Sequence, residues 1–387
     1  MIGSDRKLFE PGSAVSERIK EYGGLVGELH IIVFAKSSLG LKEKQIAPNV
    51  WLYPTNSLSR WFYVRDAVKI GKKIVFNKKF IRGRSVITTQ DPFECGLAGL
   101  KVKSKWRIPL EVQLHTDPFS PYFSGLLNFL RKRIAKKVLH KADSIRVVSE
   151  PIKNSLLTSY SLLPTSISIL PIYIDRERIE SAKLSFDLHA RYPWHFILLT
   201  VSRLTKEKNI GLALKSLALV RERFPDTGLI VVGAGPEEKS LRQKAKSLNL
   251  EAGVEFVGWQ EPARTTEGVQ SGGDLASYYK TANAYIQTSF FEGYGLSLIE
   301  AGLSGLPVLT TPVGIALELE HEKDAYIYPA GHPELFAQGI SDLIENNQKR
   351  ENLRVNLKEK LESKLMSKED YLSKMGEAWE ATAKHIR

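Results

Sequence analysis

Short apolar runs alternate with amphipathic stretches through the N-terminal half of the chain. The apolar runs have the length of strands, and the apolar residues between them recur at helical spacing. The predicted strands are 29–35, 50–53, 85–89, 110–115 and 143–149. The predicted helices are 13–22, 59–70, 93–104 and 124–141. This order of strands and helices is typical of an α/β domain with a parallel sheet.

A second series of strands and helices begins near Pro193. A chain of 387 residues is too long for one ordinary hydrophobic core, so we predict two domains. In chain order we expect a first domain, a linker, a second domain and a final helix, at 1–172, 173–190, 191–369 and 370–387. Residues 261–273 are rich in Ser, Thr and Gly and lack periodicity, which predicts a mobile surface loop.

The segment 289–301 combines a glycine turn, a helix start and two carboxylates. The turn at 293–295 can bring backbone N–H groups close to a ligand, and apolar residues then recur at helical spacing. A helix N-terminus favours an anion. Glu292 precedes this helix and Glu300 lies within it, so the layout fits a phosphate between two sugar-like groups. A capped surface helix would explain the spacing of the two glutamates equally well.

Other segments support a ligand site in the same domain. Arg203 and Lys208 follow the apolar run 196–200, which places both just past the carboxyl end of a buried strand. Ligands of open α/β sheets bind at that end of the strands. The next predicted strand runs into a turn with Gly233 and Gly235, and residues 254–258 close a third strand–helix unit.

These four segments together resemble those of retaining, GT-B-type glycosyltransferases of family four, most strongly over residues 196–330. The resemblance implies a GT-B fold, in which two Rossmann-like domains face each other across a cleft. It also implies that the final helix crosses back to the first domain. The substrate would be a nucleotide-diphosphate sugar.

The resemblance implies a role for each of these residues. Arg203 and Lys208 would hold the donor diphosphate, and Glu300 would bond the nucleotide ribose. The loop from Glu292 to Leu296 would grip the donor sugar and phosphate. Our donor-binding candidates in this domain are Gly233, Gly235, Gly293, Tyr294, Gly295, Leu296 and Glu300. Independently of the family, two cations and a helix N-terminus would stabilise the charge that grows on a departing nucleoside diphosphate.

In the first domain, polar residues follow two predicted strands. His115 resembles the family histidine that contacts the donor sugar, although a lone histidine at a strand end more often makes a structural hydrogen bond. Asp91 and Asp117 are candidates for ordering the acceptor or the histidine. Gly12 and Ser13 lie where the family has a glycine-rich loop near the phosphate. The family usually has a buried strand ahead of this loop, so we expect either a vestigial first strand or a reading frame that begins a few residues late.

The catalytic candidates are therefore His115, Arg203, Lys208 and Glu292. Paired carboxylates could indicate a covalent glycosyl-enzyme, but the resemblance commits Glu300 to the ribose. It implies retention by same-face attack, with the departing phosphate oxygen accepting the proton of the acceptor. The sequence contains no Asp-x-Asp motif, and Arg203 and Lys208 can replace a cation, so we predict no metal and no cofactor.

The net charge of +12 is concentrated in the first domain. Residues 1–172 hold 28 Lys and Arg against 13 Asp and Glu, whereas residues 173–387 hold 27 against 30. Much of the excess lies in 131–141, which follows the apolar stretch 122–130. A solvated basic helix and a helix docked on an anionic membrane explain this pattern about equally well. Nucleic acid explains it less well, because no aromatic binding motif accompanies the charges.

The remaining composition restricts the setting. The single cysteine, Cys95, excludes an intramolecular disulfide, and its expected role is packing. We see no membrane span and no secretory leader, and we expect a cytoplasmic protein with peripheral contact at the inner face of the plasma membrane. We predict sugar transfer to a lipid-linked or saccharide acceptor in envelope polysaccharide or glycolipid synthesis. The alternatives are a sugar-phosphate phosphorylase or epimerase and an inactive sugar- or nucleic-acid-binding protein.

Overall fold

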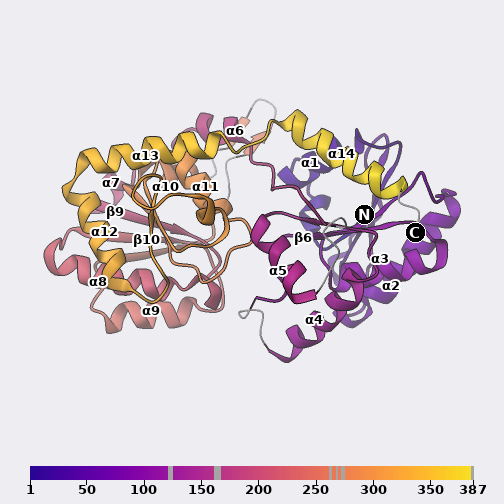
Figure 1. Cartoon of the computed structure of the whole chain (residues 1–387), viewed down its shortest axis with the longest axis horizontal. Helices are drawn as coiled ribbons and strands as arrows, with labels where there is room; N and C mark the ends of the chain where they lie inside the picture. The colour runs from indigo at the N-terminus through magenta and orange to yellow at the C-terminus, as the bar shows by residue number, and fades with distance from the viewer. Residues whose placement is uncertain (121–124, 161–166, 261–263, 267–268, 272–274, 385–387) are drawn as a thin grey trace. The chain divides into compact units, whose positions relative to one another are not determined.

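The chain forms two compact units in the computed structural model, which describes residues 1–120, 125–160, 167–260, 264–266, 269–271 and 275–384 (Figure 1). The first unit comprises Met1–Tyr173 and Met366–Arg387, and the second comprises Ile174–Leu365. The segment that the sequence indicates as a linker, 173–190, therefore belongs almost wholly to the second unit. This segment contains two short helices of the second unit, α6 (Arg176–Ser181) and α7 (Leu188–Arg191).

The first unit is built on a sheet whose strand order, among the described residues, is β3-β4-β2-β1-β5-β6-β7-β8. The strands are β1 (Ile2–Gly3), β2 (Leu29–Val33), β3 (Lys44–Ala47), β4 (Val50–Pro54), β5 (Ile87–Thr89), β6 (Leu110–Leu114), β7 (Ser144–Val147) and β8 (Ile167–Ile169). The edge strand β3 runs antiparallel to β4, and the other neighbours are parallel. The sequence did not predict β3, which is short and polar, or β8. The first strand, β1, has only two residues.

Helices cover both faces of this sheet because its strands are apolar on both sides. The helices are α1 (Ala14–Gly23), α2 (Tyr63–Asn77), α3 (Glu94–Trp106), α4 (Leu126–Leu139), α5 (Glu150–Tyr160) and α14 (Lys368–Lys384). Along β2, Ile31 packs in the same cluster as residues of α1 and α14, whereas Ile32 packs with residues of α2 and α3. Cys95 of α3 is a free, buried residue of the second cluster, as expected for a packing role.

The C-terminal helix α14 is part of the first unit, where it lies beside α1 (Figure 1). Its buried stripe is Tyr371, Met375 and Trp379. The hydroxyl of Tyr371 lies 3.1 Å from that of Tyr22 in α1, and the ring of Trp379 meets the ring of Tyr22 edge-on. The aromatic stripe therefore belongs to a hydrophobic core.

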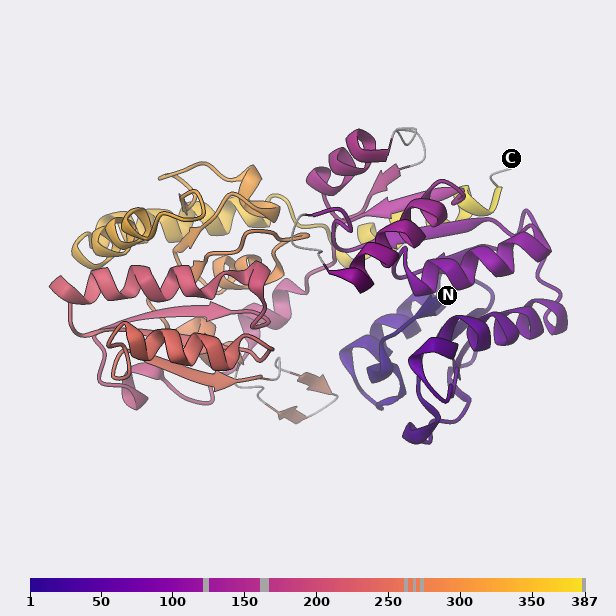
Figure 2. The same cartoon turned by 90° about the horizontal axis from the view of Figure 1, so that it is seen from below.

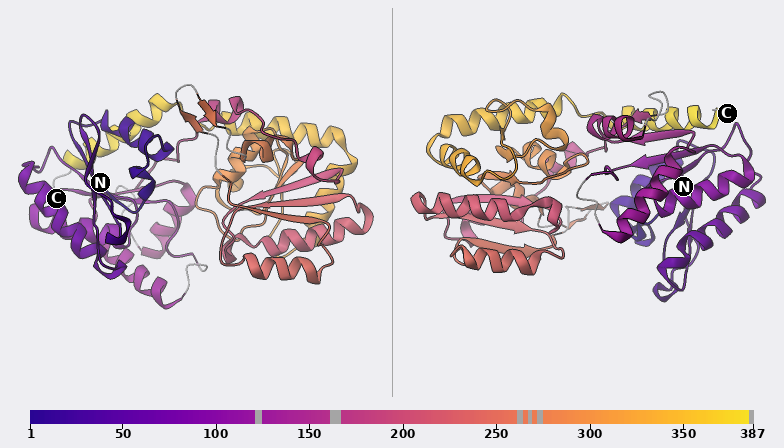
Figure 3. Two further views of the ribbon diagram at one scale, coloured as in Figure 1. Left: turned by 180° about the vertical axis from the view of Figure 1, so that it is seen from behind. Right: turned by 60° about the horizontal axis from the view of Figure 1, so that its bottom comes forward.

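The second unit contains a parallel sheet of order β11-β10-β9-β14-β15-β16. Its strands are β9 (Phe196–Val201), β10 (Thr227–Val232), β11 (Val254–Gly258), β14 (Ala284–Gln287), β15 (Val308–Thr310) and β16 (Tyr326–Ile327). Its remaining helices are α8 (Ile210–Arg223), α9 (Glu238–Ser247), α10 (Leu275–Thr281), α11 (Leu296–Leu303), α12 (Pro333–Glu345) and α13 (Asn347–Glu362). Figures 2 and 3 show helices on both faces of this sheet.

One prediction for the second unit was wrong in part. The segment 261–273 contains β12 (Arg264–Thr266) and β13 (Val269–Ser271), which pair in antiparallel register as a separate hairpin. Figure 2 shows the two short arrows of this hairpin. Threonine and valine favour strand geometry, but the polar residues and glycines around them hide the pattern in the sequence.

Candidate functional site

The strand order of the second sheet reverses direction at β9. From β9 the chain adds β10 and β11 on one side and later β14, β15 and β16 on the other. The adjacent strands β9 and β14 therefore lead at their carboxyl ends into loops at the topological switch point, the position at which open α/β sheets bind ligands. The residues predicted for this site lie on those two loops.

The two loops are joined by an ion pair between Lys208 and Glu292. Lys208 ends the short 3-10 turn Lys206–Lys208 after β9, and Glu292 follows β14. The Lys208 Nζ lies 2.7 Å from each carboxylate oxygen of Glu292, and the Oγ of Ser289 donates to Glu292 Oε1 over 2.7 Å. The side chains of Lys208 and Glu292 are only 13% and 10% exposed. The pair is therefore shielded from most of the solvent and fixed from both sides.

Backbone contacts hold the same two loops in place. The N–H of Phe290 donates to the carbonyl oxygen of Glu207 over 2.8 Å, and Thr288 Oγ1 donates to that of Asn209 over 2.9 Å. Asn209 has a φ of +47°, which asparagine tolerates better than most residues. The turn that presents Lys208 is thus tied to the loop that presents Glu292 at several points.

Arg203 occupies a different environment from Lys208. Its side chain is 70% exposed, and its Nη2 lies 3.4 Å from Oε1 of Glu207, an oxygen that also accepts from Thr205 Oγ1. The structure brings Lys208 and Glu292 together but leaves Arg203 at the solvent-facing margin of its loop. An exposed, loosely paired guanidinium is free to turn toward an incoming anion.

Helix α11 begins next to this ion pair and presents uncapped N–H groups. Gly295 is its N-terminal flanking residue, has a φ of +95° and provides no side-chain hydrogen bond. The first helical N–H groups, of Leu296 and Ser297, have no preceding turn of helix to accept from them. Tyr294 is buried, and its carbonyl accepts from Ile315 N over 2.8 Å, which anchors the turn ahead of the helix. The N-terminus of α11 therefore carries a partial positive charge, which favours a bound anion.

Glu300 lies one turn further into α11 and faces a separate small pocket of about 40 Å³, which Tyr279 and Arg178 also line. Its Oε2 accepts from the hydroxyl of Tyr279 over 3.0 Å. Burial raises the pKa of Glu300 above its usual value of 4.5, although Tyr279 and Arg178 act in the opposite direction. Within the described part of the chain, its other oxygen, Oε1, accepts no hydrogen bond.

Gly233 and Gly235 bring the loop after β10 against the loop that carries Arg203. Gly233 has a φ of +131°, and a Cβ there would lie 1.9 Å from the carbonyl oxygen of Ser202. A Cβ on Gly235 would lie 2.3 Å from the carbonyl oxygen of Leu204. Both glycines therefore have a backbone-packing role that positions the Arg203 loop.

The predicted residues of the first unit lie at the carboxyl edge of its sheet. His115 follows β6, and its side chain is exposed. Desolvation by surrounding protein atoms, together with Arg146 and Arg18, lowers the pKa of His115 to about 4. The imidazole is therefore neutral near pH 7.

Asp91 and Asp117 have structural hydrogen bonds in the same region. Asp91 Oδ1 accepts from the N–H groups of Phe93 and Cys95, at 2.8 and 3.2 Å, which organises the start of α3. Asp117 Oδ1 accepts from Phe119 N over 2.8 Å, and its Oδ2 accepts from Ser155 Oγ over 2.7 Å.

Ser13 caps α1 and helps to shape the loop that the sequence places near the phosphate. Its Oγ accepts from Ser16 N and donates to the carbonyl oxygen of Lys7. Gly12 has a φ of +70°, which glycine adopts without strain. Ser13 and Gly12 therefore each have a structural role in this turn, apart from the phosphate contact that the sequence predicts for them.

Sequence reasoning missed the residues that support the site. Ser289, Glu207 and Tyr279 contact Glu292, Arg203 and Glu300, respectively. Ser289 and Glu207 could have been noted from their closeness in sequence to the residues that they hold. Tyr279 lies 21 residues before Glu300 on another helix, so no local pattern indicates their contact.

The architecture defines the class of protein. The Anabaena protein HepE in complex with UDP and glucose matches 98% of this chain and 99% of its own, with a TM-score of 0.74 and 19% identity. Sucrose-phosphate synthase of Thermosynechococcus elongatus matches with a TM-score of 0.76 and 18% identity, over 98% of both chains. Both are GT-B glycosyltransferases, and the present chain has the same fold of two Rossmann-like units.

The sequence assigns the family within this class. Residues 187–360 match the family described as glycosyl transferases group 1, and residues 28–178 match that described as glycosyltransferase family 4. The chain therefore belongs to the glycosyltransferase family that these two descriptions name together.

Two curated relatives are alpha-monoglucosyldiacylglycerol synthases. That of Acholeplasma laidlawii is 23% identical over 64% of this chain, and that of Streptococcus pneumoniae is 29% identical over 58%. The matched regions span 65% and 51% of these relatives' own lengths.

Proposed function

We propose that this chain is a retaining glycosyltransferase, which moves a sugar from a nucleotide-diphosphate sugar to an acceptor. The observation that carries the proposal is the convergence of Lys208, Glu292 and the uncapped start of α11 at the switch point of the second sheet. A cation and a helix N-terminus are suited to stabilise a departing diphosphate. The family membership supports the same activity.

Lys208 would bind the donor diphosphate without leaving Glu292. An ammonium group has three N–H donors, and the two oxygens of Glu292 occupy at most two of them. The remaining donor can bind a phosphate oxygen. Arg203 would turn from Glu207 toward the same diphosphate and bind it through two N–H groups. Lys208 and Arg203 together would then neutralise the leaving group without a metal ion.

Glu300 would bind the ribose of the nucleotide. Tyr279 holds one carboxylate oxygen and leaves the other to accept from a ribose hydroxyl. In this arrangement Glu300 is committed to the nucleotide, which argues against its use as a covalent nucleophile. Retention would then proceed by same-face attack, in which the acceptor oxygen bonds the anomeric carbon, the sugar–phosphate bond breaks and the departing phosphate oxygen takes the acceptor's proton.

The residues of the first unit enter the proposal with supporting roles. We assign His115, with its neutral imidazole, to the donor sugar, and the loop at Gly12 and Ser13 to the donor phosphate. Asp91 and Asp117 would act through the backbone turns that they hold on the acceptor side.

The acceptor that we propose is a saccharide or a lipid-linked saccharide. Named relatives include the glucosyldiacylglycerol synthases and the capsular polysaccharide glycosyltransferase CapM of Staphylococcus aureus. The first turns of α4 carry exposed apolar side chains, with Leu126 at 80% exposure, and the helix continues with basic residues. An amphipathic basic helix of this kind supports peripheral contact with an anionic membrane. No helix in the described part of the chain is long and apolar enough to span one.

The direct test is transfer from labelled nucleotide sugars. A thermal-shift panel of nucleoside diphosphates identifies the base, and the matching sugar donors are then supplied with membrane lipids or oligosaccharides in the presence of excess EDTA. We expect labelled product with the donor's anomeric configuration. If a nucleoside diphosphate binds but no donor is transferred or hydrolysed, the chain is a binding protein. Complete loss of activity in EDTA would contradict the metal-free mechanism alone.

A further inference from the structure

Polar side chains form a buried row on one face of the first sheet. Glu111, Gln113 and Arg146 are each 5% exposed or less. In the register of β6 and β7, Glu111 lies beside Ser144, and Gln113 lies beside Arg146. The Oγ of Ser144 lies 2.7 Å from Oγ1 of Thr382 in α14, so the row faces the side of the sheet that α14 covers. The proposed mechanism of sugar transfer does not use Arg146.

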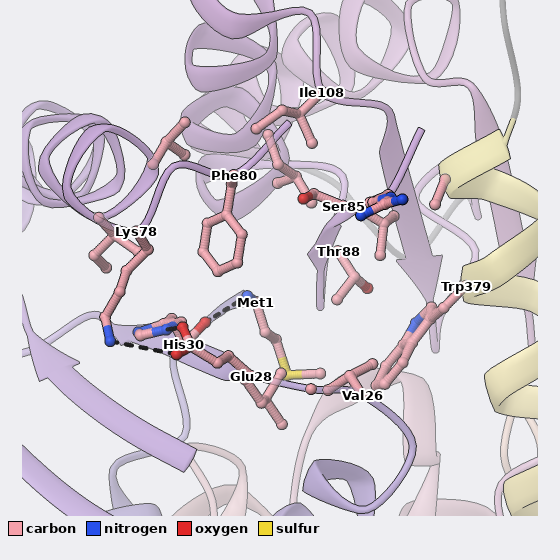
Figure 4. Close-up of a pocket in the computed structure, with 18 of the residues that line it drawn as sticks. Met1, Val26, Glu28, His30, Lys78, Phe80, Ser85, Thr88, Ile108 and Trp379 are labelled. Atoms are coloured by element: carbon pink, nitrogen blue, oxygen red, sulfur yellow. Dashed lines mark hydrogen bonds and ion pairs between the residues drawn. The ribbon is translucent and has the colours of Figure 1, made fainter. Parts of the chain in front are cut away.

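Glu111 accepts hydrogen bonds from uncharged groups. Its Oε1 accepts from Thr88 Oγ1 over 2.8 Å and from Trp379 Nε1 over 3.2 Å. Thr88 and Trp379 also line a cavity of about 970 Å³ in this unit (Figure 4). The Nε of Arg146 lies 3.6 Å from the same oxygen, which is within ion-pair distance but makes no hydrogen bond. Glu111 therefore balances the charge of Arg146 without occupying its N–H donors.

The guanidinium of Arg146 donates no hydrogen bond to the residues that the structure describes. Its Nε is fully buried and unpaired. Nη1 and Nη2 are unpaired as well but are not fully buried, so the small exposure of the side chain, 6%, lies at these two nitrogens. A guanidinium has five N–H donors, and leaving such donors unpaired in a desolvated position is costly. Arg146 therefore presents unpaired N–H groups at the edge of a buried row.

Arg146 lies diagonal to His115. Gln113 is the direct neighbour of Arg146, and His115 follows Gln113 by two positions, which places it on the same face. Diagonal neighbours on one face lie within reach of a long side chain such as arginine. After desolvation, the charge of Arg146 is the largest cause that lowers the pKa of His115. The guanidinium is therefore close to the imidazole.

Arg18 adds a second cation at the same place. It is exposed, and it lies in the second turn of α1, the helix that follows the loop with Gly12. The charge of Arg18 also lowers the pKa of His115, and no carboxylate among the described residues raises it. Arg18, His115 and Arg146 therefore form a positive cluster within a single unit.

We propose that Arg18, His115 and Arg146 bind an anionic group, a carboxylate or a phosphate, that the sugar acceptor carries. This inference rests on the proposed sugar transfer, in which the first unit binds the acceptor. A guanidinium binds a carboxylate or phosphate through parallel N–H groups, and Nη1 and Nη2 of Arg146 are unpaired. The charge of the donor would be matched in the second unit by Lys208 and the start of α11. The cluster in the first unit is then left for the acceptor.

Three small probes test this anion site without requiring transfer. Phenyl β-D-glucuronide supplies a carboxylate, phenyl phosphate supplies a phosphate, and phenyl β-D-glucoside is the uncharged match of the glucuronide. In calorimetric or NMR titrations we expect at least one anionic probe to bind about 10-fold or more tightly than the glucoside, as a hydrogen-bonded charge in a desolvated site allows. Equal affinities for all three probes would overturn the proposal.

The double variant Arg146→Met/Glu111→Gln removes the cation together with the carboxylate that balances it, so neither charge is left buried and unpaired. It should lower the affinity for the anionic probe by about 10-fold and leave that for the glucoside nearly unchanged. Its melting temperature checks that the variant folds. Retained preference for the anionic probe would contradict the role of Arg146.

Arg18→Gln tests the same site without a change in the core. It should weaken the anionic probe by about 3-fold, as expected for an exposed ion pair. The matched control is Lys20→Gln, which removes the same charge from roughly the opposite side of α1 and should have no effect. Equal losses in the two variants would indicate a general charge effect and contradict the site.

Two further measurements separate this site from that of the donor. Lys208→Met should still bind the anionic probe, and binding that is lost there but kept in the double variant would move the anion to the second unit and overturn the proposal. The nucleotide sugar found by thermal shift should not displace the probe, because displacement would assign the anion to the donor sugar. Absence of transfer from every nucleotide sugar, with probe binding lost in the double variant, would refute the proposed function and support the anion site.

Discussion

At the scale of single residues, the central feature is the shielded pair of Lys208 and Glu292. The pair ties two loops together, and in the proposed site it would also leave one ammonium donor for the diphosphate. Loss of Lys208 alone would leave Glu292 without its partner in a mostly buried position, which is costly. Activity and stability must therefore be measured separately.

We expect Lys208→Met to lower kcat by about 10²-fold or more, because a contact that strengthens in the transition state is lost. Lys208→Met should also lower the melting temperature. The double variant Lys208→Met/Glu292→Gln should recover much of the melting temperature but not the activity. Steady-state kinetics and calorimetry provide the two readouts.

The control for this series is Lys206→Met, which changes an exposed lysine of the same turn. It should have near-normal kcat. Recovery of activity in the double variant would contradict the role of Lys208 at the diphosphate.

The raised pKa of Glu300 leads us to expect that nucleotide binding depends on pH. Burial raises its pKa, so the carboxyl group takes up a proton at a higher pH than an ordinary glutamate. Protonation removes charge from the acceptor for the ribose hydroxyl, so affinity should fall as the pH decreases from 7 toward 5. Calorimetric titration with the uncharged nucleoside avoids the titration of phosphate. Glu300→Gln should bind weakly with a flat pH profile, and a wild-type profile equally flat would remove Glu300 from the ribose site.

At the scale of elements, helix α4 combines exposed apolar residues with a basic continuation. Leu126, Leu127, Phe129 and Leu130 are exposed in its first two turns. The sequence alone could not distinguish a solvated basic helix from a membrane-docking helix. The exposure of these apolar side chains favours docking, because a monomeric surface rarely leaves such a group uncovered.

The corresponding prediction concerns liposomes that contain anionic lipid. Each basic residue near such a surface contributes about 1 kcal/mol, so replacing Lys132, Arg133 and Lys137 with Gln should lower the partition coefficient by about 10²-fold at low salt. Replacing Lys69, Lys73 and Lys79, which lie on or just after α2, removes the same charge and should have a much smaller effect. Sedimentation with liposomes measures both. Equal losses in the two variants would indicate a general charge effect and no docking by α4.

At the scale of the whole molecule, the first unit is built from both ends of the chain. Trp379 of α14 is buried against Tyr22, and its Nε1 donates to Glu111 Oε1 over 3.2 Å. Glu111 is itself buried and lies near Arg146. The last helix is therefore a structural part of a unit whose other elements lie more than 190 residues earlier.

Trp379→Ala should lower the stability of the first unit by about 3–5 kcal/mol, as expected for truncation of a large buried side chain. Calorimetry should show a lower transition temperature for the first unit and little change for the second. Trp61→Ala is the matched control, because Trp61 is 85% exposed. A shift of both transitions by Trp379→Ala would mean that the two units unfold together.

The sequence predicted most elements because the apolar pattern along each strand reports burial directly. The predicted strands and helices of the N-terminal half all occur, with most ends within a few residues, although the helix predicted at 59–70 extends to Asn77. The misses have identifiable causes: β3 is a polar edge strand, and the hairpin of β12 and β13 has no apolar face to reveal it. The aspartates illustrate another limit, since a polar residue after a strand can equally cap a turn, as Asp91 does.

By itself, the sequence determined the α/β class, the resemblance to the glycosyltransferase family and the short stretches that carry its cations and carboxylates, because these depend on neighbours along the chain. Tertiary structure alone decided that Lys208 pairs with Glu292 while Arg203 remains exposed, and that Tyr279 holds Glu300. Those two contacts join residues 21 or more positions apart. Only the packing of strands and loops fixes the distances between such residues.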